Sequence, residues 1–308
     1  MNDPVFSAKT EFLKGIVHYN DNENKQASEC FKKVIPKLQE HNLKSELADA
    51  YSYYGLNCLG MGDYITSIEN YEKSNVLSKE LNKHIQVCEN NLYLGRDYEN
   101  MGNNTKALQY YQAALEIAKN LKADKMATEA TLFIGALYSD GIDHKLGMEY
   151  LSKAAEYAEK VQDTTLLINA YTYIANSYYY EKDYTSALKM YEKIKILCNT
   201  HGSKNTYAGT LGNMGNVYAE MGDTEKAMEL QLEAVRIFDE IGDKQGLTIC
   251  YSAIGIDYMN LKQYGKALEY FNKSLPMAQE MQSLEDLIEI HENLSRLYAE
   301  TKDYENAY

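Results

Sequence analysis

The sequence predicts an all-α protein built from stacked helical hairpins, which is an α-solenoid. Small residues recur every 40 positions, apolar residues between them follow helical spacing, and only three prolines interrupt the 308 residues. Each unit of such a repeat contacts mainly its neighbours in the chain. The recurring small residues are Gly15, Gly55, Gly95, Gly135, Ala175, Gly215, Gly255 and Ser295.

The repeat divides the chain into a leader (1–7), seven complete repeats and a partial eighth (288–308). The complete repeats are 8–47, 48–87, 88–127, 128–167, 168–207, 208–247 and 248–287. We expect two helices in each repeat, because a break such as Met101-Gly102-Asn103 separates two amphipathic stretches. Gly should end the first helix there, and Asp or Asn should cap the second.

The recurring glycine predicts close contact between the two helices of a repeat. Gly inside a helix costs about 0.5–1 kcal/mol relative to Ala, so its repeated use indicates that a methyl group would clash with a neighbour. A bulky residue such as Tyr71 or Tyr111 stands sixteen positions later in most repeats, and we expect it to pack over the glycine. Gln231 is the exception at this position.

These positions resemble the tetratricopeptide repeat (TPR). The repeat 88–127 shows the family's order of small residue, Tyr, Ala, aromatic residue and Ala, as Gly95, Tyr98, Ala107, Tyr111 and Ala114. The resemblance implies a right-handed TPR superhelix whose concave groove binds proteins or peptides. Repeats of 40 residues, where about 34 are usual, are similar to the longer arrays of kinesin light chains and of bacterial peptide-responsive regulators.

Composition excludes several classes of partner. The net charge of −14 opposes binding of nucleic acid and of anionic membranes. No apolar stretch approaches the roughly 18 residues that span a bilayer, and the first residues lack the charged and apolar regions of a signal peptide. The five cysteines are scattered without CxxC spacing. We therefore expect a cytoplasmic protein, or a periplasmic one if a leader was removed, without nucleic-acid binding or membrane insertion by this segment.

Motifs for catalysis and for metal binding are absent from the sequence. It lacks the signatures of phosphate-binding loops, dinucleotide-binding folds, zinc proteases, serine hydrolases and kinases. The six histidines are isolated from one another and have no metal-ligand spacing. We therefore expect no enzyme, no catalytic residues, no metal site and no cofactor.

The first helix of each repeat is expected to present one face to a ligand. Counted from the start of a repeat, positions 4, 7, 8 and 11 face the core, and positions 6 and 9 lie on the other side of the helix. Aromatic, amide and arginine side chains on that side suit the binding of an extended peptide, although the tyrosines could equally pack across a tight interior. The candidate groove residues are Tyr53, Tyr93, Arg96, Tyr173, Asn176, Asn213, Asn216, Asn293 and Arg296.

Two functional hypotheses follow. The first is a non-catalytic scaffold that binds a protein or peptide partner in the concave groove. The second is the sensory module of a bacterial signal-transduction or transcriptional regulator, with an effector domain beyond Tyr308. We expect the chain to continue, because Leu294, Leu297 and Tyr298 would otherwise be partly uncovered, and an uncovered end predicts fraying or self-association through the C-terminal end.

Overall fold

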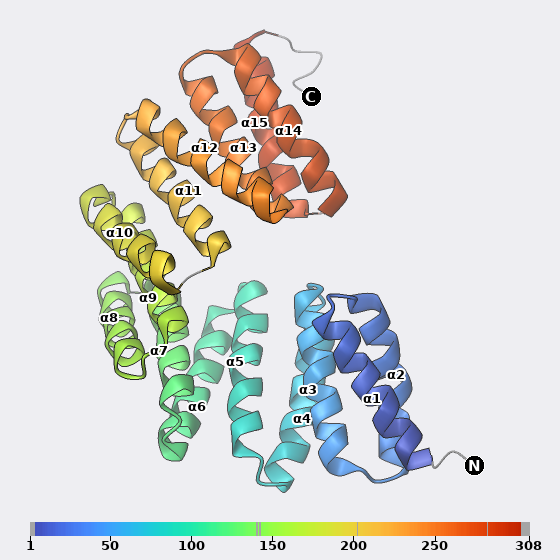
Figure 1. Cartoon of the computed structure of the whole chain (residues 1–308). Coiled ribbons are helices and arrows are strands. Elements are labelled where there is room, and N and C mark those ends of the chain that lie inside the picture. The colour runs from blue at the N-terminus through green and yellow to red at the C-terminus, as the bar shows by residue number, and fades with distance from the viewer. Residues whose placement is uncertain (1–3, 140, 142, 202, 282, 303–308) are drawn as a thin grey trace. The chain divides into compact units, whose positions relative to one another are not determined.

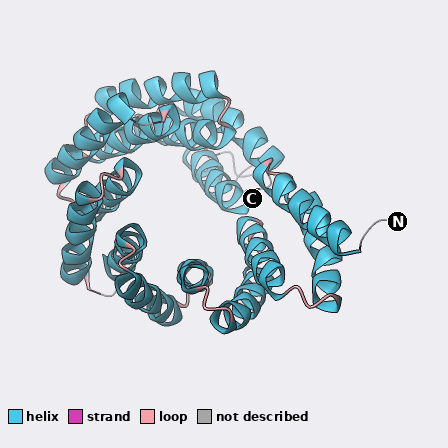
Figure 2. Cartoon of the chain, turned by 60° about the horizontal axis from the view of Figure 1, so that its bottom comes forward, coloured by secondary structure: helices cyan, strands magenta, loops and turns pink. Residues whose placement is uncertain are grey.

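The protein, described by a computed structural model, is helical throughout the residues that the structure describes, which are 4–139, 141, 143–201, 203–281 and 283–302. No strand occurs among them (Figure 2). The fifteen helices there are α1 (Pro4–Asn20), α2 (Asn24–Glu40), α3 (Lys44–Gly60), α4 (Tyr64–Glu80), α5 (His84–Asn100), α6 (Asn104–Leu121), α7 (Asp124–Ser139), α8 (His144–Lys160), α9 (Thr164–Tyr180), α10 (Tyr184–His201), α11 (Lys204–Glu220), α12 (Thr224–Ile241), α13 (Lys244–Asn260), α14 (Tyr264–Met281) and α15 (Leu284–Glu300).

The chain forms two compact parts, an N-terminal part of residues 1–166 and a C-terminal part of residues 167–308. Helices follow one another through each part in chain order, as the colours of Figure 1 show. Each odd-numbered helix up to α13 begins four residues before the repeat boundary counted from the sequence. The expected all-α fold of stacked hairpins is thus confirmed.

The odd-numbered helices form the inner layer of each part. In the N-terminal part, α1 contacts α3, α3 contacts α5 and α5 contacts α7; in the C-terminal part, α11 contacts α13 and α13 contacts α15. Within the described residues, the even-numbered helices pack against odd-numbered helices and not substantially against one another. Closer spacing of the odd-numbered helices places their shared face on the concave side of each part.

The predicted packing over glycine is confirmed. A Cβ atom built on Gly55 would lie 3.1 Å from ring atoms of Tyr71, which is tighter than ordinary van der Waals contact. Gln231 fills the same place despite its different chemistry, because its Cγ would lie 2.7 Å from a Cβ on Gly215. The other close pairs are Gly15–Phe31, Gly95–Tyr111, Gly135–Leu151 and Gly255–Phe271.

The turns within the hairpins also form as expected. Gly62 ends its turn with a φ of 75°, in the left-handed region that favours glycine. The Asp63 side chain then accepts a hydrogen bond from the backbone N–H of Thr66 at 3.2 Å, which caps α4. Asn103 and Asp223 cap α6 and α12 in the same way.

The expectation that Leu294 and Leu297 would be partly uncovered is wrong. They are 7% and 2% exposed, because α15 packs this side against α13 and α14. Tyr298 is half-buried. The exposed large apolar residues of α15 are Leu284, at 72%, and Ile288, at 52%. Cys88, the counterpart of Ile288 on α5, is fully buried and donates a hydrogen bond to a backbone carbonyl of the second helix of its own hairpin.

Candidate functional site

The inner face of the N-terminal part contains a cavity of about 820 Å³ between α1, α3 and α5. Its apolar wall includes Phe12 of α1, Leu56 of α3 and the rings of Tyr53 and Tyr93. The Tyr53 ring also packs edge-on against Phe12, with ring centroids 6.0 Å apart. The aromatic side chains therefore line the cavity and hold neighbouring inner helices together.

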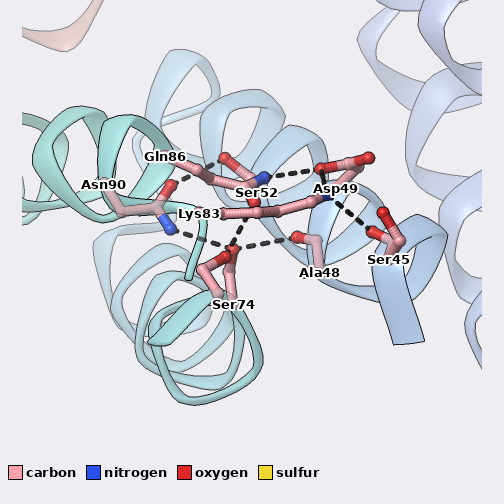
Figure 3. A network of polar contacts seen from close by, with 9 residues as sticks. Ser45, Ala48, Asp49, Ser52, Ser74, Lys83, Gln86 and Asn90 are labelled. Atoms are coloured by element: carbon pink, nitrogen blue, oxygen red, sulfur yellow. Dashed lines mark hydrogen bonds and ion pairs between the residues drawn. The ribbon is translucent and has the colours of Figure 1, made fainter. Parts of the chain in front are cut away.

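A polar network lies at one side of this cavity (Figure 3). The carboxylate of Asp49 on α3 accepts hydrogen bonds from the Lys83 ammonium at 2.7 Å and from the Gln86 amide at 2.8 Å. Lys83 also donates to the backbone carbonyl of Ser45 at 3.2 Å. The start of α5 is thus fixed to α3 by charged and amide groups that line the cavity.

Asn90 continues the network into the core between three helices. This fully buried amide accepts from the hydroxyl of Ser52 on α3 at 2.7 Å, and it donates to Ser74 and Asn75 of α4 at 2.9 and 3.0 Å. Ser74 in turn donates to the backbone carbonyl of Ala48 at 2.8 Å, as Figure 3 shows. A buried network whose members find partners makes the floor of the groove rigid.

Carboxylates at equivalent positions of α5 and α7 give this inner face an acidic character. Burial raises the pKa of Glu89 and of Glu129, and the guanidinium of Arg96 lowers the pKa of Glu129 by a smaller amount. Neither carboxylate has an ion-pair partner within 4.0 Å among the described residues. Arg96 itself is exposed on α5, so the face carries both positive and negative charge.

The inner face of the C-terminal part contains two smaller cavities, of about 140 Å³ and 340 Å³. Asn216 and Gln231 line both, and Asn213 lines the smaller one. Gly209 opens this region, because a Cβ atom built there would meet nothing within 4 Å. Gln231 occupies a position that is aromatic in most other repeats, and its amide supplies polar atoms to the wall of both cavities.

The groove amides are oriented by their own repeats. The Asn176 carbonyl oxygen accepts a hydrogen bond from the Tyr191 hydroxyl at 2.6 Å, and the Asn216 carbonyl oxygen accepts one from the Gln231 amide at 3.3 Å. Within the described residues neither amide nitrogen donates a hydrogen bond, so both can donate to a ligand. The side chain of Asn213 makes no hydrogen bond within the described part of the chain.

The structure divides the nine predicted groove residues between the two parts. Tyr53 and Tyr93 line the N-terminal cavity, and Asn213 and Asn216 line the C-terminal ones. Asn293 is the most buried of the nine, at 5% exposure. The others are Arg96 on α5, half-buried Tyr173 and Asn176 on α9, and exposed Arg296 on α15. Their role in binding stays a prediction.

Sequence reasoning missed the acidic residues of the groove and Lys83. Asp49, Glu89, Glu129 and Glu289 all occupy the second position of their repeats, and this recurrence of acidic residues was the available signal. Lys83 was harder to find, because it lies in the turn before α5 and approaches Asp49 only in the folded chain.

Other kinds of site find no support in the described part of the chain. No group of three or more His, Cys, Asp or Glu side chains there could hold a metal ion. All five cysteines are buried and unpaired. Among the described helices, none combines the length and the apolar character that crossing a membrane requires.

The sequence matches a known repeat family, and the fold is similar to solved structures. The profile of the tetratricopeptide repeat matches residues 46–120, 166–240 and 206–280. The structure is similar to the apo form of the quorum sensor NprR from B. thuringiensis, with a TM-score of 0.73 and 13% identity over 100% of this chain and 86% of that one. It is also similar to the apo form of RapI, with a TM-score of 0.71 and 16% identity over 90% of this chain and 99% of that one.

A third similar structure is a Rap protein complexed with competence and sporulation factor, with a TM-score of 0.67 and 14% identity over 98% of this chain and 94% of that one. Identities this low establish a shared fold only. The matched profile, in contrast, covers more than half of the sequence. The chain therefore belongs to the tetratricopeptide repeat family.

Proposed function

We propose that this chain is a non-catalytic scaffold that binds a peptide, or an extended segment of a protein, along the inner face of its odd-numbered helices. One observation carries the proposal: in both parts this face contains cavities lined by aromatic, amide and carboxylate side chains. The larger volume of about 820 Å³ lies within the range of ligand-binding clefts.

The groove amides suit the backbone of an extended peptide. Such a backbone presents carbonyl oxygens that need donors, and the amide nitrogens of Asn176, Asn213 and Asn216 supply donors on successive inner helices α9 and α11. The orientation of Asn176 and Asn216 is fixed before binding by Tyr191 and Gln231, which lowers the entropy that binding must overcome.

The alternative is a sensory module of a bacterial regulator. The similarity to NprR, described as a quorum sensor, and to a Rap protein complexed with competence and sporulation factor supports a peptide as the bound partner. In this proposal the protein works in the cytoplasm, where its five unpaired, buried cysteines would remain reduced.

The test uses peptides selected from a randomised library on the full chain. Calorimetry should show that Asn176→Ala, Asn213→Ala and Asn216→Ala combined weaken binding at least tenfold, about 1.4 kcal/mol, at a temperature where a thermal melt shows that the variant is folded. The matched control combines Asn199→Ala and Asn272→Ala, two exposed amides on α10 and α14. Equal affinity of wild type, groove variant and control would refute the proposal.

A further inference from the structure

We infer that the ligand of the C-terminal part carries a basic side chain, Arg or Lys, that binds in the 340 Å³ cavity against Gln231 and Asp257. This inference rests on the proposed function and adds the chemical class of one ligand residue. The cavity is formed within the C-terminal part, between α9, α11, α12, α13 and α15.

Two buried acceptors on the wall of this cavity lack partners. Gln231 is 1% exposed and Asp257 is 3% exposed, and both side chains line the cavity. The Gln231 Oε1 and Asp257 Oδ2 atoms make no hydrogen bond within the described structure. Buried acceptors without donors are rare and destabilising in folded proteins. A ligand that brings donors would satisfy them.

Comparison with another repeat shows what Asp257 lacks. Asp97 occupies the equivalent position on α5, and its carboxylate accepts a hydrogen bond from the Ser67 hydroxyl of the preceding repeat at 2.7 Å. Ala227 holds the place of Ser67 in the repeat before Asp257, so this hydroxyl donor is missing. Asp257 also lines a cavity, and a donor from outside the chain can therefore take that role.

The negative charge of the carboxylates that line the cavity favours a positively charged ligand group. Glu220 of α11 and Glu289 of α15 also line it, and none of its lining residues is Lys, Arg or His. Burial raises the pKa of Asp257 to about 6, against the opposing effect of the Gln231 amide, so this carboxyl is mostly ionised at neutral pH. Three carboxylates thus surround one space without a countercharge of their own.

The shape of the cavity suits a long basic side chain. Ile249, Ala253 and Ile256 provide apolar wall on the same inner face of α13. The methylene groups of Arg or Lys can lie along such a wall while the charged end reaches polar atoms. A guanidinium offers five N–H donors and an ammonium offers three, and both match a set of acceptors.

The test uses three capped tripeptides, Ala-Arg-Ala, Ala-Lys-Ala and Ala-citrulline-Ala. Citrulline has nearly the shape of Arg without its charge. Methyl NMR spectra of the full chain, labelled at Ile δ1, should show saturable shifts of Ile249 and Ile256 with the Arg or the Lys peptide. The citrulline peptide should bind at least tenfold more weakly. The stronger of the two basic peptides then identifies the preferred headgroup.

Two variants of the cavity and one control complete the test. Asp257→Asn removes the charge at constant shape, and Gln231→Met removes the amide at similar volume. Each should weaken the basic peptide at least fivefold, and thermal melts establish that both variants fold. Asp239→Asn removes an exposed carboxylate of α12 and should leave binding unchanged.

Each outcome has one meaning. Equal binding of the citrulline and arginine peptides, or unchanged binding by Asp257→Asn, would overturn the basic-residue inference and leave the groove as a peptide site. Absence of shifts with all three peptides at millimolar concentration would overturn the inference too. The proposed function would still be judged by its own test, because the library-selected peptides need not contain a basic residue.

Discussion

The contact between Gly255 and Phe271 gives the sharpest stability prediction. A Cβ atom on Gly255 would lie 2.6 Å from Cε1 and 2.8 Å from Cδ1 of the ring, which is fully buried and has no open space to enter. Gly255→Ala gains up to about 1 kcal/mol of helix propensity but must displace the ring by roughly 0.8 Å to restore van der Waals contact. With an overpacking cost of about 1–3 kcal/mol, we expect a net loss of up to about 2 kcal/mol.

Gly265 provides a control within the same hairpin. It lies in the first turn of α14, and a Cβ atom there would meet nothing within 4 Å. Gly265→Ala should therefore stabilise by up to about 1 kcal/mol through propensity alone. Urea unfolding followed by circular dichroism measures both variants, and hydrogen exchange in α13 reports the local effect if the array unfolds in stages. Stabilisation by both substitutions would refute the close contact.

Three further predictions concern buried groups and the last helix. Burial raises the pKa of Asp97 to about 7, so the folded state binds this proton more tightly than the unfolded state does. Stability should therefore fall by up to about 4 kcal/mol between pH 4 and pH 7, and Asp97→Asn should remove most of this fall in urea titrations. Asn90→Ala should destabilise by about 2–4 kcal/mol because three partners lose their hydrogen bonds, whereas exposed Asn272→Ala should change stability by less than about 0.5 kcal/mol. In hydrogen exchange, the backbone amide of Leu297 should be protected like that of Val217; rapid exchange at Leu297 would contradict its burial.

Local sequence patterns were sufficient to predict the hairpins. The glycine at position 8 and the bulky residue sixteen positions later face each other within one hairpin, so their contact depends on helix geometry and a short turn. The caps at Asp63 and Asn103 are similarly local. The burial of Leu297 could not be predicted, because it depends on how far α15 turns its apolar side toward the preceding hairpin.

The groove was predictable in its location and much less so in its chemistry. Helical periodicity placed Asn213 and Asn216 on the inner face, where they line cavities. The sequence showed Gln231 as the exception among the bulky residues, but not that it lines a cavity. That cavity forms between its own repeat and Asp257 of the next repeat. Pairings between repeats require the distance between stacked hairpins, which no single repeat encodes.

Photo-crosslinking tests the central claim most directly, because it locates the bound peptide on the full chain. A library-selected peptide carrying a photoreactive phenylalanine is irradiated on the protein, and the crosslinked residues are identified by mass spectrometry. Binding in the groove predicts crosslinks to inner residues of the odd-numbered helices, such as Ala253 of α13 or Tyr53 of α3. Crosslinks confined to exposed residues of the even-numbered helices, such as Asn199 of α10, would contradict it.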